Sequence, residues 1–400
     1  MAPMRIQSWR SKLPVNAWLW LGLTGALLAG CATSAPNWPR TGDPLVDGKA
    51  AIEQGPQRDQ VLWQYRTAGA AMRRGQYADA RALLDAALAR VGGIFGPDPD
   101  AKRSRSYFAS EAKKTFLGEP YERAMAYFYR GLLYWMDGEP DNARACFRSA
   151  QFMDSDAEKQ EYSGDYVLFD YLDGLTTAKL GGDGSEAYRR ATNVVHLATP
   201  PPYDLPANVL FFVELGRGPL KYASGEFSEQ LRFLPGKSAA QAARIRCDGQ
   251  EQVVPAWDDL TFQATTRGGR VMDHVLANKA VFKRATDATG NAAIIGGAIM
   301  ASQQGHHSAV DEVGAGLMLA GLISKIVSAA TTPSADVRNW DNLPQLLGFG
   351  ALHLPSGPHT ISVDFLDAAG QALAGASKTL PVEVWGTPRD TVVFVSDQNQ

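Results

Sequence analysis

Residues 121–155 read YERAMAYFYRGLLYWMDGEPDNARACFRSAQFMDS, and this stretch decides the fold of the first half of the chain. Helical spacing places Tyr127, Gly131 and Tyr134 on one face of a first helix, which ends at Gly138. One face of a second helix then carries Ala143, Phe147 and Ala150. The small residues let the two helix backbones approach, and the aromatic side chains fill the space between them.

This spacing resembles the tetratricopeptide pattern, a 34-residue unit of two helices that buries its apolar face by stacking on neighbouring units. A first copy has small or apolar residues at the matching positions: Ala68, Ala71, Ala80, Leu84 and Ala87. It turns at Gly75, and a third, more degenerate copy extends over 162–195 with its turn at 181–184. The sequence therefore predicts a tetratricopeptide-like helical domain over 61–200.

The amino end has the pattern of a secretory signal. Residues 1–12 carry basic and no acidic side chains, an apolar run follows over 13–29, and the run ends in an LAGC box. The box resembles the bacterial lipoprotein signal, which implies a signal peptide over 1–30 and acylation of Cys31. An ordinary membrane anchor is the alternative, for which the apolar run is short. Ala32, where an Asp would favour inner-membrane retention, implies sorting to the outer membrane, on its periplasmic face.

Composition limits the classes of partner. Apolar content of 45% and charged content of 20% are ordinary for a globular protein, and 400 residues exceed the usual size of one domain. A formal net charge of -3 argues against a nucleic-acid partner, since such proteins have a strong basic excess. Proline and glycine recur over 31–60, which predicts a tether between the membrane and the folded part.

The pattern changes after the prolines at 200–206. Short extended runs between Gly and Pro turns predict a β-sandwich-like domain over 201–400, so that the whole chain is of the α+β class. Strands are expected over 208–214, in a hairpin at 243–254 that turns at Asp248-Gly249, and over 352–366, 382–385 and 391–395. An Ala/Gly-rich helical hairpin interrupts them at about 271–332. It either contacts lipid, makes a homo-oligomer or covers a face of the sheet, and its short apolar segments favour the last reading.

Several motifs recur in one order: GEPYERAM at 118–125, the helical unit after it, GRGPLK at 216–221, ADVRNWDNLP at 335–344 and LPSGPHTISV at 354–363. In this order they resemble the uncharacterised tetratricopeptide-containing lipoproteins of Gram-negative envelopes. The resemblance spans about residues 61–365 in outline. It implies a place in the cell envelope, and no catalytic residue comes with it.

The sequence holds no motif that names a reaction. It contains no nucleophile elbow, phosphate-binding glycine loop, CxxC or HExxH. His306 and His307 are adjacent and cannot share one helix face, so we predict neither a metal site nor a cofactor. Cys146 and Cys247 are either buried thiols or, in an oxidising compartment, a disulfide pair. We expect a protein that is not an enzyme.

Two hypotheses of function follow. The first is a lipid-anchored periplasmic scaffold that binds a partner protein in a groove of the helical stack, with Tyr127 and Tyr134 as groove residues; a stack without any ligand is the simpler reading of the same pattern. The alternative is a protein that binds or modifies peptidoglycan at a site between the two domains. In that case Trp257, Trp340 and Trp385 would stack on sugar rings.

Overall fold

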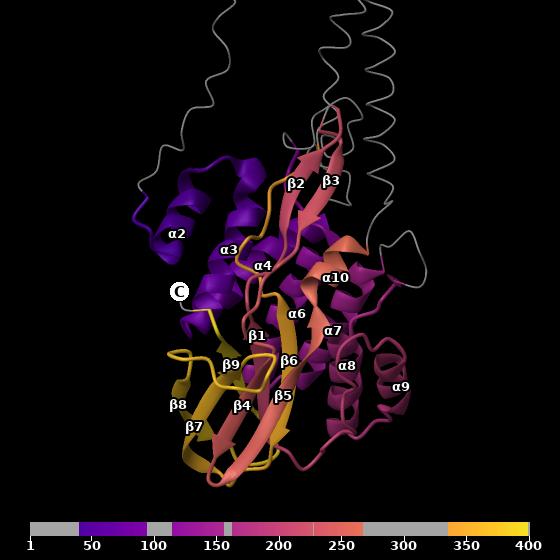
Figure 1. Cartoon of the computed structure of the whole chain (residues 1–400), viewed down its shortest axis with the longest axis vertical. Coiled ribbons are helices and arrows are strands. Elements are labelled where there is room, and N and C mark those ends of the chain that lie inside the picture. Colours follow the sequence, from indigo (N-terminus) through magenta and orange to yellow (C-terminus); the bar gives the residue numbers. More distant parts are fainter. Residues whose placement is uncertain (1–39, 94–113, 156–161, 227, 267–334, 399–400) are drawn as a thin grey trace, which may run out of the picture.

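The fold is α+β, with a helical region followed by a sheet (Figure 1). This computed structural model describes residues 40–93, 114–155, 162–226, 228–266 and 335–398. The predicted signal peptide over 1–30, the predicted acylation site Cys31 and the predicted helical insertion at about 271–332 lie outside the described residues, as does the pair His306-His307.

The helical region is a stack in which each helix packs on the next. Its elements are α2 (Pro44–Gln54), the single turn η1 (Gln57–Asp59), α3 (Gln60–Arg73), α4 (Tyr77–Gly93), α6 (Pro120–Met136), α7 (Pro140–Asp154), α8 (Val167–Lys179) and α9 (Ser185–Asn193). The pairs α3–α4, α6–α7 and α8–α9 form three helix hairpins, at the positions where the sequence predicts three repeats.

All three hairpins end their first helix in the same way. The chain turns at Gly75, Gly138 and Gly181, whose φ angles are 68°, 83° and 83°. In each turn, the residue after the glycine donates its backbone N–H to the carbonyl five residues earlier: Gln76 to Ala71, Glu139 to Tyr134 and Gly182 to Thr177, each at 2.9 Å. This is the Schellman cap, and it needs a residue that accepts positive φ.

Helix α2 corrects the prediction of a tether over 31–60, because Pro44–Gln54 are helical and pack on α3. Asp43 caps the helix by accepting hydrogen bonds from the first two free backbone N–H groups, and a proline occupies the first helical position. Leu45 and Ala51 are buried. The proline and Gly55 that suggest a flexible segment instead begin and end a helix.

The second half is one seven-stranded sheet, which corrects the prediction of a sandwich of two sheets. Its strands are β1 (Val209–Leu215), β4 (Ala242–Cys247), β5 (Gln250–Asp259), β6 (Leu346–Leu352), β7 (Gly357–Leu366), β8 (Lys378–Val384) and β9 (Thr391–Ser396). The order is β8-β7-β4-β5-β6-β1-β9, antiparallel except for β1 beside β9. The sheet nearly closes into a barrel, since the edge strands β8 and β9 touch.

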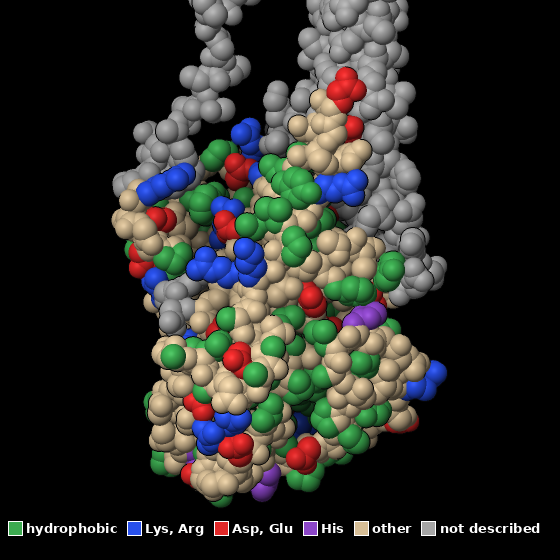
Figure 2. Space-filling model, viewed as in Figure 1, with side chains coloured by type: hydrophobic (Ala, Val, Ile, Leu, Met, Phe, Trp, Pro, Cys, Tyr) green, Lys and Arg blue, Asp and Glu red, His purple; other side chains and the backbone are tan. Residues whose placement is uncertain are grey.

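Two smaller elements complete the described part of the second half. Strands β2 (Leu220–Ser224) and β3 (Gln230–Leu234) form a separate hairpin, and the short helix α10 (Leu260–Thr265) follows β5. Leu220, Tyr222 and Leu234 of the hairpin are 42%, 41% and 52% exposed. Hydrophobic side chains gather on this part of the surface in the upper half of Figure 2.

Strand β1 is buried on both faces and joins the two halves. Its residues alternate between the core inside the sheet, which holds Phe211 and Val213, and a core shared with the helices, which holds Leu210 and Phe212. The first helix of each hairpin contacts the sheet. Helices α3 and α6 contact β9, and α8 contacts β5 and β6. The sheet of the same chain therefore covers the inner side of the helical stack.

The alternation also brings a carboxylate to the shared core. Glu214 faces the helices and pairs with Arg73 of α3 at 3.0 Å, and both side chains are 1% exposed. The hydroxyl of Tyr129 on α6 donates to the other oxygen of Glu214. Since a buried carboxylate without partners is strongly unfavourable, this contact fixes how α3 and α6 sit on β1.

The close approach of α6 and α7 gives a test of the fold. A Cβ at Gly131 would lie 2.7 Å from a ring carbon of Phe147, which is fully buried. We expect Gly131→Ala to lower the free energy of unfolding by about 1–3 kcal/mol, because the ring has no room to move. Gly92→Ala is the control: it lies on α4 with nothing within 4 Å and should stabilise by up to about 1 kcal/mol. Urea unfolding measures both, and equal effects would contradict this packing.

Candidate functional site

The predicted groove residues Tyr127 and Tyr134 are half-buried side chains that join α6 to its neighbours. The Tyr134 ring lies 3.5 Å from the guanidinium carbon of Arg130, which pairs with Asp85 of α4 at 2.6 Å. Tyr127 interacts with Cys146 of α7, and partial burial raises its pKa. Both tyrosines pack against the shared core, so the structure gives them a part in helix packing.

Three of the sequence motifs meet at one buried junction. Glu122, from GEPYERAM, accepts hydrogen bonds from Lys221 of GRGPLK at 2.5 Å and from the backbone N–H of Trp340 at 2.7 Å. The side chains of Lys221 and Glu122 are 2% and 0% exposed. Tyr121 donates to the Asn339 side chain at 3.2 Å. The junction thus joins α6, the β2–β3 hairpin and the stretch before β6.

Arg338 extends this junction to the start of the helical stack. Its guanidinium pairs with Asp59 at 2.7 Å and with Asp336 at 2.6 Å, and it donates to the Lys114 carbonyl at 2.9 Å. It also lies over the ring of Phe116 at 5.4 Å. Because these charged groups satisfy one another, the junction is an internal brace and offers little to a ligand.

A hollow of about 310 Å³ remains open on the other side of the stack, between α7, α8 and α9. Its lining is Phe147, Arg148, Gln151, Phe152, Ser155, Ser163, Gly164, Phe169, Asp170, Asp173 and Arg190. Arg190 pairs with Asp170 at 3.1 Å and with Asp173 at 3.3 Å. Phe152 is 71% exposed, and Arg148 makes no hydrogen bond or ion pair with the described residues. We call this hollow the α7–α9 groove.

The tryptophans do not form a sugar platform. Trp257 and Trp340 are each 1% exposed, so the interpretation of these two as stacking residues is wrong. Trp385 is 46% exposed, with the Arg389 guanidinium 4.5 Å from its ring centroid. Side chains of the shared core fill the space between helices and sheet, where the alternative hypothesis needs a site.

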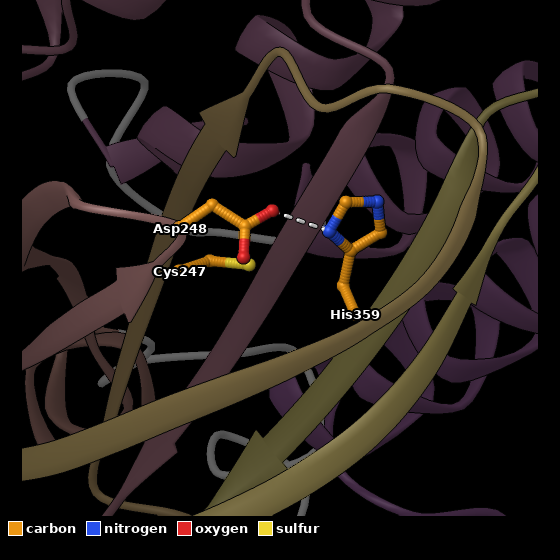
Figure 3. A group of neighbouring side chains, drawn as sticks. All are labelled: Cys247, Asp248 and His359. Carbon is orange, nitrogen blue, oxygen red and sulfur yellow. Dashed lines mark hydrogen bonds and ion pairs between the residues drawn. The ribbon is translucent and has the colours of Figure 1, made fainter.

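Besides the junction and the groove, the structure contains a cluster of three side chains from distant parts of the sequence. Cys247 ends β4, Asp248 follows in the turn to β5, and His359 is the third residue of β7 (Figure 3). One ligand atom from each of the three lies within 4.8 Å of the other two. His359 Nδ1 is 2.6 Å from Asp248 Oδ2, and His359 Nε2 is 2.8 Å from the carbonyl oxygen of Pro355.

The environment of this cluster sets its protonation. The Pro355 carbonyl, and then the Asp248 carboxylate, raise the pKa of His359. Burial raises the pKa of the Cys247 thiol, whose residue is 3% exposed. Cys146 and Cys247 are both free thiols, which corrects the alternative of a disulfide between them. Sequence reasoning missed the cluster, because only the pairing of β4 with β7 brings its members together.

Comparison with known proteins found no match: no protein family, curated protein or solved structure matches this chain. None of the helices in the described part of the chain is long and apolar enough to cross a membrane. We therefore infer function from the sequence motifs and from the geometry of the groove and the cluster.

One buried carboxylate links the sheet to the wall of the α7–α9 groove. Asp258 of β5 is 3% exposed and accepts hydrogen bonds from the backbone N–H groups of Val167 and Leu168 at the start of α8, both at 2.9 Å. Burial outweighs these bonds and raises the pKa of Asp258 to about 7.

The pKa of Asp258 predicts how stability depends on pH. The folded protein holds this proton more tightly than the unfolded chain, whose Asp pKa is about 3.9. The stability that Asp258 contributes is therefore complete at pH values below the pKa of the unfolded chain. It is lost as the pH rises to about 7. We expect the free energy of unfolding to fall between about pH 4 and pH 7, and to fall less in Asp258→Asn. Denaturant titrations at several pH values test this, with the exposed Asp183→Asn as control; an unchanged slope in Asp258→Asn would contradict it.

Proposed function

We propose that this protein is a non-enzymatic interaction scaffold of the Gram-negative envelope, held by acyl chains on Cys31 at the periplasmic face of the outer membrane. The LAGC box, the tetratricopeptide-like spacing of the three helix hairpins and the lack of catalytic motifs in the sequence support this proposal. The observation that carries it is the α7–α9 groove, which stays open while the sheet covers the inner side of the stack.

The occupant of the groove is a segment of another periplasmic protein that carries a carboxylate beside a large apolar side chain. The apolar side chain packs on Phe152, whose exposed ring is large enough to bury substantial area. The carboxylate pairs with Arg148, which has no other partner among the described residues, while Asp170 and Asp173 already pair with Arg190. A basic segment would have to displace Arg190 to bind.

Photo-crosslinking in cells identifies the partner. A photoreactive amino acid replaces Phe152 in the full chain, and the same amino acid at exposed Leu180, which does not line the groove, is the control. We expect a partner that is captured from position 152 and not from position 180. A peptide with the sequence of its crosslinked segment is then titrated with the purified protein.

The proposal predicts that peptide binding depends on the positive charge of Arg148. We expect Arg148→Glu to weaken peptide binding by about tenfold or more, since a matched charge pair becomes a repulsion. Arg189→Glu changes the same charge on α9 outside the groove lining and should leave binding unchanged. Equal affinity of wild type and Arg148→Glu, or a crosslinked segment without acidic residues, would overturn the assignment of the groove.

The anchor has its own test. We expect Cys31→Ser to leave the leader uncut and the protein without acyl chains, because the hydroxyl cannot replace the thiol in lipoprotein maturation. Mass spectrometry of the amino terminus and membrane fractionation measure both effects, and Cys146→Ser is the control for loss of an unrelated thiol. Cleavage at the same bond in Cys31→Ser would sink the lipoprotein part of the proposal.

A further inference from the structure

We propose that Cys247, Asp248 and His359 form a binding site for a zinc-class divalent metal ion, separate from the α7–α9 groove. A thiolate, a carboxylate and an imidazole together are the donor set of tetrahedral Zn²⁺ sites. Three protein ligands leave a fourth position, which water fills in sites of this kind. The side chain of Asp248 is 53% exposed, so the ion enters from that side.

The ring of His359 is already oriented for this role. Its Nε2 lies 2.8 Å from the Pro355 carbonyl, which accepts a hydrogen bond from Nε2–H and leaves Nδ1 directed at Asp248 (Figure 3). Metal-binding histidines commonly donate their second ring N–H to a carbonyl or carboxylate, which fixes the tautomer. The LPSGPHTISV motif thus supplies both the side-chain ligand and the backbone carbonyl that orients it.

The other two ligands sit on a rigid turn. Asp248 and Gly249 have φ angles of 50° and 78°, as in the tight hairpin turn that joins β4 to β5. Cys247 precedes them as the last residue of β4, with its thiol among the buried side chains. Since β4 pairs with β7, the sheet holds the turn opposite His359.

The distances and charges fit such an ion. Bonds of about 2.0–2.3 Å to zinc put neighbouring donor atoms roughly 3–4 Å apart, so donors within 4.8 Å need to move inward by about 1 Å. The exposed Asp248 side chain can make most of that movement. On binding, the Cys247 thiol and the Nδ1–H of His359 release their protons to solvent, and the ion takes the place of the Asp248–His359 hydrogen bond. One thiolate and one carboxylate then neutralise the charge of the ion.

Cobalt titration tests the site in the full chain, purified in detergent through a tag without histidine. The background is Cys31→Ser, which removes a competing thiol. We expect roughly one Co²⁺ per chain with a thiolate-to-cobalt charge-transfer band, and displacement of that Co²⁺ by Zn²⁺. Cys247→Ser should abolish the band, and His359→Gln should weaken binding by at least about tenfold.

The controls separate this site from other donors. Cys146→Ser and His353→Gln should bind as the background does, while circular dichroism shows that each variant is folded. His359 is half-buried and Cys247 is buried, so His359→Gln keeps the test valid if Cys247→Ser unfolds. The site is excluded if no Co²⁺ binds, or if binding survives His359→Gln and is lost when His306 and His307 are both replaced by Gln. Since neither outcome involves the α7–α9 groove, the scaffold proposal stands or falls separately.

Discussion

The rest of the structure depends on a strand that has no solvent-exposed face. Because side chains alternate along β1, one set fills the interior of the sheet and the other set lies under the helices. Glu214 belongs to the second set, and its pairing with Arg73 and Tyr129 allows only one placement of the helices on the sheet. The two predicted domains therefore share a hydrophobic core.

This shared core changes where a partner can bind. Stacked helix hairpins commonly use their inner side for ligands, and here the sheet of the same chain occupies that side. Among the described residues, the α7–α9 groove and the turn that carries Cys247 and Asp248 stay accessible to other molecules. Glu122 and Lys221, by contrast, pair with each other and Arg338 pairs with Asp59, so the motifs that resemble a lipoprotein family mostly hold the molecule together.

Features that depend on local physics were predictable from the sequence. The turns at Gly75, Gly138 and Gly181 and the hairpin at Asp248-Gly249 need positive φ, which few residues accept. Strand β6 was missed, because a continuous apolar run with glycines has no alternation. The choice between sandwich and barrel, the burial of Trp257 and the meeting of Cys247 with His359 all depend on which distant strands pair. A single sequence does not encode that order in any local pattern.

The pairing of β5 with β6 has a consequence for how this chain can vary. The two strands are hydrogen-bonded neighbours, and Leu260 donates to the Gln345 carbonyl at 2.8 Å, so both ends of the intervening segment are anchored in the sheet. Closing a longer loop adds only about 0.6 kcal/mol for each doubling of its length. Evolution can therefore change the length of the connection between Leu260 and Gln345 at little cost to the pairing of β5 with β6.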